Sequence, residues 1–173
     1  LSLTLPGPKP IEARLNNVGP DTALGRILVH KLLVHSEPNL AASSKGYYVY
    51  DDIIRIPEMF YTENSLGKKI AWYQMGENAF IHAAWVQPVF NKPNTVAEKI
   101  PEGGCLGEIT VGKTPVYYAD GTQNYMRTFY YENTFWVIDK HIDDYGVPYY
   151  ELWDDLGEGS WFVRASAVRL VTK

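Results

Sequence analysis

The sequence predicts an all-β protein: two tandem small β-barrels with short 3₁₀ turns, preceded by an extended N-terminal arm. Three blocks of the first half recur in the second half at one offset of 82 residues, with Phe162 opposite Phe80, which indicates a duplicated domain. Each copy contains short runs rich in β-branched and aromatic residues, separated by Gly, Pro, Asn and Asp. Five short strands in about 65 residues, without a helix, are typical of a small closed barrel.

The first repeated block is the opening strand of each copy. Residues 25–39, GRILVHKLLVHSEPN, align with residues 107–121, GEITVGKTPVYYADG. The residues of the first copy that are identical to their counterparts are Gly25, Ile27, Val29, Lys31 and Val34. Both segments end in turn-forming residues, so we predict a strand that leads into a turn.

The second repeated block contains a tight turn. Residues 47–56, YYVYDDIIRI, align with residues 129–138, FYYENTFWVI, and the short polar pairs Asp51–Asp52 and Asn133–Thr134 support a turn within each run. Because alternate residues of a strand share a face, we expect one parity of each run to face the core. The predicted core residues are Tyr48, Ile54, Ile56, Tyr130, Trp136 and Ile138.

The last two strands close each copy. WYQM at residues 72–75 best matches YYEL at residues 149–152, and FIHAAWVQPV at residues 80–89 matches FVRASAVRLV at residues 162–171. The segments HAAW and RASA are too short for an α-helix and suit a single 3₁₀ turn. Two further predicted core residues are Trp72 and Trp161.

The composition divides the chain into four segments. Residues 1–23 hold four Pro and are expected to form an extended arm. Residues 24–90 and 106–173 are the two barrels. Residues 91–105, NKPNTVAEKIPEGGC, combine two Pro with two Gly and show no periodicity, so we expect a semi-stiff linker.

Charge and hydropathy exclude two classes of partner. The net charge of −4 arises without any basic cluster, whereas nucleic-acid binding needs concentrated Lys and Arg. No apolar run approaches the roughly 20 residues of a membrane helix, so we expect no membrane span.

The sequence predicts no cofactor and no metal site. His30 and His35 lie five residues apart on one predicted strand and would face opposite sides. Asp143–Asp144 and Asp154–Asp155 are interpreted as solvated loop acids, because the spacing of a Ca²⁺-binding loop is absent. A Gly-rich phosphate loop and a Gly-x-Ser-x-Gly element are also absent from the sequence.

The order of the blocks resembles that of bacterial SH3-like domains over residues 24–171: GRILVHKLLVHSEPN, then YDDIIRI, WYQM and FIHAAWVQPV. Two copies joined by a segment containing IPEGG resemble the region upstream of the catalytic domain in certain secreted bacterial L,D-transpeptidases, which cross-link peptidoglycan. The resemblance implies an extracytoplasmic, cell-wall-associated bacterial protein. That family's catalytic domain carries a Ser/Thr-His-Gly-Cys motif, whereas Cys105 lies in Gly-Gly-Cys-Leu without an adjacent His. We therefore expect a chain that is not an enzyme, and a catalytic domain, where there is one, after Lys173.

Binding is the function that these observations favour. The leading hypothesis is a non-catalytic module that positions an attached transpeptidase domain by binding peptidoglycan or an extended peptide. The alternative is a protein-interaction or spacer domain that binds Pro-rich peptide, including its own arm at residues 5–10. The candidate ligand-binding rings, which could instead pack the barrels together or cover the arm, are Tyr47, Tyr50, Tyr117, Tyr118, Tyr131, Tyr145 and Trp153.

Overall fold

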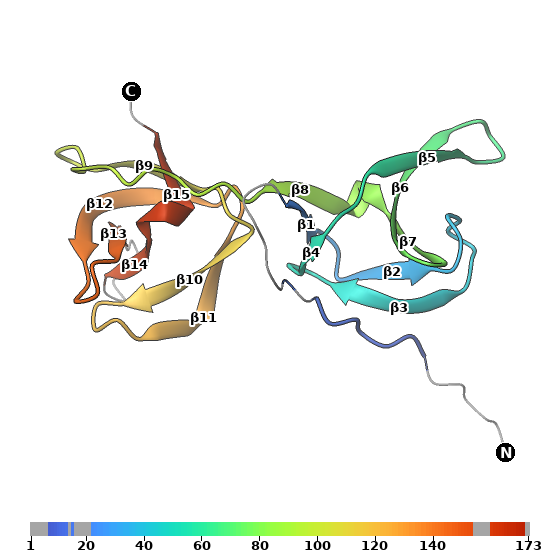
Figure 1. The fold of residues 1–173 in the computed structure, drawn as a ribbon, viewed down its shortest axis with the longest axis horizontal. Coiled ribbons are helices and arrows are strands. Elements are labelled where there is room, and N and C mark those ends of the chain that lie inside the picture. Colours follow the sequence, from blue (N-terminus) through green and yellow to red (C-terminus); the bar gives the residue numbers. More distant parts are fainter. Residues whose placement is uncertain (1–6, 14, 16–21, 154–159, 172–173) are drawn as a thin grey trace, which may run out of the picture. The chain divides into compact units, whose positions relative to one another are not determined.

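The protein is all-β, as the sequence predicts (Figure 1). The computed structural model describes residues 7–13, 15, 22–153 and 160–171. Within these residues the chain forms β-strands and two 3₁₀ turns. Spatial proximity divides them into two compact units, the first ending at Pro88 and the second beginning at Val89, and each unit is described by itself. None of the described helical segments is long and apolar enough to cross a membrane.

Unit 1 contains two antiparallel sheets. The five-stranded sheet has the order β3-β2-β7-β6-β5, and its strands are β2 (Lys31–His35), β3 (Ser44–Val49), β5 (Met59–Glu63), β6 (Lys69–Gly76) and β7 (Ala79–His82). The three-stranded sheet has the order β4-β1-β8, and its strands are β1 (Ala23–Ile27), β4 (Ile53–Arg55) and β8 (Val86–Phe90). The first 3₁₀ turn, η1, spans Ala83–Trp85.

Unit 2 contains one seven-stranded sheet of order β11-β10-β14-β13-β12-β9-β15. Its strands are β9 (Cys105–Ile109), β10 (Lys113–Tyr118), β11 (Gln123–Tyr130), β12 (Thr134–Ile142), β13 (Pro148–Leu152), β14 (Trp161–Arg164) and β15 (Val168–Val171). The second 3₁₀ turn, η2, spans Ala165–Ala167, so both 3₁₀ turns lie where the repeat predicts them.

The sheets do not close into barrels among the described residues, so the two closed barrels expected from the sequence are not confirmed. Each sheet keeps two edge strands. In unit 1 the chain leaves the five-stranded sheet after β3 and enters the three-stranded sheet at β4. The turn between β3 and β4 contains Asp51, whose φ of 66° changes the direction of the backbone sharply. The Asp52 carboxylate supports it by accepting a hydrogen bond of 2.9 Å from the Val49 N–H.

The two copies are related by 81 residues, not 82, in this turn and in the strands on either side of it, since the Lys31–Val49 pair corresponds to the Lys113–Tyr130 pair. Asp51 and Glu132 both have φ of 66°, and they donate their N–H to Ile27 O and Ile109 O at 3.0 and 2.9 Å. Gly25 pairs with Ile54, and Gly107 pairs with Phe135. The alignment at a constant offset was therefore wrong by one residue within this block.

This one-residue shift reverses the predicted faces of the strands in the second copy. A shift of one residue along a strand places each side chain on the opposite face of the sheet. Trp136 is 44% exposed, while Val137 is fully buried, so the prediction of Trp136 as core is wrong. Tyr130 and Ile138 are half-buried and lie outside the core cluster. The residues that do pack against that core from these two strands are Phe129, Phe135 and Val137.

The other core predictions are confirmed. In unit 1 Ile54 is buried, and Tyr48 and Ile56 pack against the core. Trp72 and Trp161 are buried in their respective units. The final strands also align as predicted, because the Tyr73–Ile81 pair of β6 and β7 corresponds to the Tyr150–Val163 pair of β13 and β14.

The first strand of each copy has a glycine at its centre, and side chains from two other strand segments pack directly against it. A Cβ at Gly25 would lie 2.3 Å from a methyl group of Val86 and 2.9 Å from one of Ile56. A Cβ at Gly107 would lie 2.8 Å from Val137 and 2.9 Å from Val168. Because the β-branched neighbours cannot rotate away freely, only glycine fits at these two positions.

We expect Gly107→Ala to lower the free energy of unfolding by about 1–3 kcal/mol through overpacking of the unit 2 core. Gly76→Ala is the matched control, since a Cβ there meets only Ala79 at 3.9 Å, and we expect a change within about 0.5 kcal/mol. Urea denaturation of both variants measures the difference. Equal stabilities would contradict the packing described at Gly107.

His82 begins the 3₁₀ turn η1 and is sensitive to protonation. Its Nδ1 accepts a hydrogen bond of 3.1 Å from Ala84 N–H, and burial, with His35 nearby, holds the pKa of His82 below its ordinary value. Because folding disfavours the proton, the unfolded chain binds it more readily below about pH 6.5.

We therefore expect the stability of the protein to fall as the pH decreases below about 6.5 and the unfolded chain takes up this proton. His82→Asn removes the titration and keeps an acceptor for the turn, so its melting temperature is expected to fall less between about pH 7 and about pH 5. Thermal melts followed by circular dichroism measure both proteins. Parallel decreases would show that His82 does not contribute.

Candidate ligand-binding pocket

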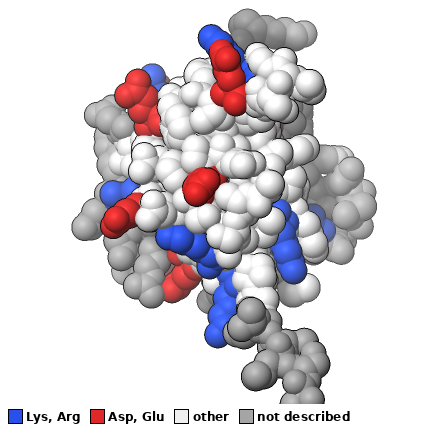
Figure 2. Space-filling view, turned by 90° about the vertical axis from the view of Figure 1, so that its right-hand side faces the viewer, with Lys and Arg blue, Asp and Glu red and all other residues white. Residues whose placement is uncertain are grey.

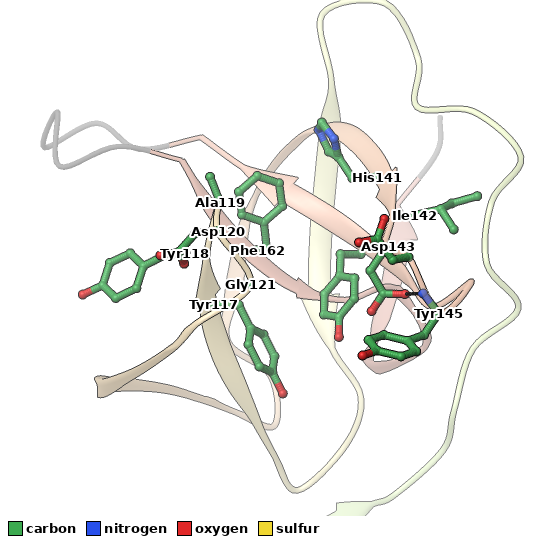
Figure 3. A pocket seen from close by; sticks show the side chains of 12 residues that line it. Tyr117, Tyr118, Ala119, Asp120, Gly121, His141, Ile142, Asp143, Tyr145 and Phe162 are labelled. Atoms are coloured by element: carbon green, nitrogen blue, oxygen red, sulfur yellow. Dashed lines mark hydrogen bonds between the residues drawn. The ribbon is translucent and has the colours of Figure 1, made fainter.

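An open cavity of about 610 Å³ lies at one end of the sheet of unit 2 (Figure 3). Three parts of the chain line it: the end of β10 with the turn that follows, the end of β12 with the turn that follows, and single residues of β13 and β14. The lining residues that carry the description below are Tyr117, His141, Asp143, Tyr145, Tyr149 and Phe162.

Two tight turns fix the walls of the cavity. Gly121 has a φ of 81°, and the Asp120 carboxylate accepts a hydrogen bond of 2.9 Å from Thr122 N–H. Hydrogen bonds from the Thr122 hydroxyl and N–H lower the pKa of Asp120. In the other turn, Asp143 Oδ1 accepts from Tyr145 N–H at 2.9 Å and from Val147 N–H at 2.8 Å. Such side-chain bonds hold Asx turns in one conformation, so the cavity has a largely preformed shape.

Aromatic rings and one imidazole make up half of the twelve lining residues. Tyr117 and Tyr149 meet edge to face, with 5.5 Å between ring centres, and His141 meets Phe162 in the same way at 5.2 Å. Cross-strand pairing brings the rings together, because Tyr117 lies opposite Phe162 and His141 lies opposite Tyr149. Tyr145 is 92% exposed at the mouth. In Figure 3 the Tyr118 ring points away from the Tyr117 ring.

The charged groups that line the cavity are acidic. Asp120, Asp143 and Asp144 contribute carboxylates, His141 contributes an imidazole, and Lys and Arg are absent from the described lining. Carboxylates accept hydrogen bonds and favour positive charge, while aromatic faces accept both sugar rings and cations. The cavity therefore suits a ligand with hydroxyl or ammonium donors.

Three of the seven rings predicted from the sequence to bind a ligand line this cavity: Tyr117, Tyr118 and Tyr145. Two further candidates lie elsewhere in unit 2. Tyr131 faces Phe90, with 6.3 Å between ring centres, beside another cavity of about 410 Å³. Trp153 lines a third, of about 480 Å³, with Trp136.

The remaining two candidates belong to unit 1. Lys31 Nζ lies 4.8 Å from the centre of the Tyr47 ring, and the Arg26 guanidinium lies 5.9 Å from the centre of the Tyr50 ring. The backbone of Tyr47 also holds the arm, because Ile11 N–H donates to Tyr47 O at 2.8 Å and Tyr47 N–H donates to Lys9 O at 3.1 Å. The arm therefore contacts the backbone of Tyr47, one of these two candidates.

Sequence reasoning missed the pocket residues His141, Tyr149 and Phe162. The signal that could have found them is the turn sequence Asp143-Asp144-Tyr145-Gly146, which predicts a hairpin and therefore places His141 opposite Tyr149. Of the two acidic pairs, Asp143–Asp144 lines this cavity and Asp154–Asp155 lies outside the described residues.

Cys105 lies away from the cavity, in β9. It is buried, its strand pairs with β12 at Val137, and burial raises the pKa of its thiol. A raised pKa disfavours the thiolate, which is the nucleophilic form.

Charge on the face drawn in Figure 2 is dispersed. Acidic and basic side chains lie among uncharged residues on that face, and near its top they lie next to each other. In searches against known proteins, no family model matches the chain, and no curated protein is significantly similar to it.

Proposed function

We propose that the chain is a non-catalytic binding module of the bacterial cell envelope, and that the cavity of unit 2 holds a segment of peptidoglycan. The observation that carries this proposal is the open cavity with aromatic walls and carboxylates at its rim. Stacking on Tyr117 and Tyr145 suits sugar rings, and the carboxylates suit hydroxyl and ammonium groups. Both kinds of group occur in a polymer of sugars and short peptides.

The order of the sequence blocks resembles that of bacterial SH3-like domains, and this resemblance supports a location in the cell envelope beside an L,D-transpeptidase domain. A tandem pair of such domains beside an L,D-transpeptidase domain would hold that enzyme against its polymeric substrate. Binding by many weak contacts along one polymer raises the effective concentration of a tethered catalytic domain without any chemistry in the module itself.

A second candidate function is peptide binding at the edge strand β3 of unit 1. Pro10 forms a parallel bridge with Tyr47, and Ile11 and Ala13 pack against the core. The arm thus uses the unpaired backbone groups of an edge strand, which is the mode by which extended peptides add to a sheet. This observation favours a peptide ligand at the edge of β3.

Binding to insoluble peptidoglycan tests the role of the cavity. We expect the purified chain to be retained, and we expect the double variant Tyr117→Ala, Tyr145→Ala to bind with about tenfold lower affinity. The reason is that truncation of a central aromatic anchor costs about 1 kcal/mol or more. Tyr125→Ala is the matched control, because Tyr125 is 85% exposed in the same unit and does not line the cavity. Equal retention of all three proteins, or no retention of the wild type, would overturn the proposal.

The variant Gly46→Ala tests the contact between the arm and the edge strand β3. We expect it to release the arm, since a Cβ at Gly46 would lie 2.8 Å from Ile11 and 2.9 Å from Lys9 O. The Ile11 amide, protected in the wild type by its bond to Tyr47, is expected to exchange with deuterium at the rate of an open chain.

A chain lacking residues 1–13 provides the binding test for the same edge. A synthetic peptide of residues 7–13 is expected to bind this shortened chain and raise its melting temperature, but not to bind the wild type, whose edge is covered. Absence of peptide binding together with an unchanged melting temperature would contradict the second candidate.

A further inference from the structure

Three side chains with metal-binding atoms converge beside the cavity of unit 2: Asp139, His141 and Glu151. His141 Nε2 lies 2.7 Å from Glu151 Oε2 and 3.7 Å from Asp139 Oδ2. One ligand atom from each of the three residues lies within 4.8 Å of the others. An imidazole and two carboxylates therefore share one small volume.

The sheet brings these residues together without any special loop. Asp139 and His141 alternate on β12 and so project from the same face, and Glu151 on β13 is the register partner of Asp139. Lys140, between them, is directed elsewhere, since its Nζ donates to Ala97 O at 2.8 Å and Glu98 O at 2.6 Å. The Lys140 ammonium group is thus bound to backbone carbonyl groups and not to the two carboxylates.

Two outer contacts orient the candidate ligands. The Ser160 hydroxyl donates a hydrogen bond to Glu151 Oε1, which leaves Oε2 for His141. The Phe162 ring meets the imidazole edge to face and limits its rotation. Outer contacts of this kind fix the direction of metal ligands in known sites.

From this geometry we propose that Asp139, His141 and Glu151 bind a divalent transition-metal ion of the Zn²⁺ type. Ligand atoms around a tetrahedral Zn²⁺ lie roughly 3.3 Å apart, given metal–ligand distances of about 2.0–2.1 Å. The distances of 2.7 and 3.7 Å from His141 lie on either side of that value, and the ligand atoms of Asp139 and Glu151 lie within 4.8 Å of each other, so side-chain rotations can bring all three to it. Three protein ligands leave a further coordination position open, and His141 also lines the cavity.

The duplication supplies an internal comparison. The Met59–Tyr73 pair of unit 1 corresponds to the Lys140–Tyr150 pair of unit 2, because Tyr73 and Tyr150 pair with the equivalent residues Ile81 and Val163. The residues of unit 1 at the positions of the three ligands are therefore Glu58, Phe60 and Gln74. A phenyl ring cannot ligate a metal, so the site is particular to the second copy.

Calorimetric titration of the whole chain, prepared without a polyhistidine tag, with Zn²⁺ tests the proposal. We expect saturable binding to the wild type, and His141→Ala and Glu151→Gln are each expected to weaken it by about tenfold or more. Glu151→Gln keeps the size of the side chain and an acceptor for Ser160, so it retains the fold if His141→Ala does not. His30→Ala is the control, because His30 is an exposed histidine of unit 1.

The proposal does not rest on peptidoglycan binding, since the titration uses the metal alone. Co²⁺ supports it further if its visible absorption increases with the wild type and not with His141→Ala, because those bands are stronger at a low coordination number. Absence of Zn²⁺ binding, equal binding by Glu151→Gln, or loss of binding in His30→Ala would each overturn it.

Discussion

Both units depend on a strand position that carries no side chain. Gly25 in β1 and Gly107 in β9 let two neighbouring strands cross closely, one that follows a sharp turn and one that follows a 3₁₀ turn. The side chains above Gly25 are Val86 and Ile56, and those above Gly107 are their structural equivalents Val168 and Val137. This repeated set of contacts sets the spacing of the strands on which the rest of each unit is built.

The same core supports different surfaces in the two copies. In unit 1 the path of β12 is divided between two strands, β4 (Ile53–Arg55) and β5 (Met59–Glu63), whereas in unit 2 the single strand β12 runs for nine residues to Ile142. The second part of this strand lies beyond the buried Val137 and pairs with β13, as β5 pairs with β6. It carries Asp139 and His141 and leads into the turn at Asp143 that forms one wall of the cavity. The two copies thus share this strand path, and the residues that the second copy carries on it form one wall of the cavity.

The sequence predicts the duplication, both 3₁₀ turns and most of the core, because these follow from local pattern and from repetition. It could not locate the one-residue slip, which lies between β10 and the part of β11 that pairs with its first residues, because the sequence does not show how these strands pair. Trp136 was consequently assigned to the wrong face. The cavity was harder still, because Tyr117, His141 and Phe162 meet only through pairing among β10, β12, β13 and β14. Solvent exposure inferred from alternation does not indicate which end of a sheet a ring occupies.

The equivalent edge strands of the two copies are protected in different ways, which favours a division of binding between them. In unit 1 the arm covers β3 through Lys9 and Ile11. In unit 2 the equivalent strand β11 breaks its register with β10, so that Thr128 pairs with Pro115 but the next pair is Asn124 with Val116. The residues left out between them bulge from the edge, and a bulged edge does not accept an added strand. The bulge therefore disfavours strand addition at β11, whereas in unit 1 the arm already pairs with β3.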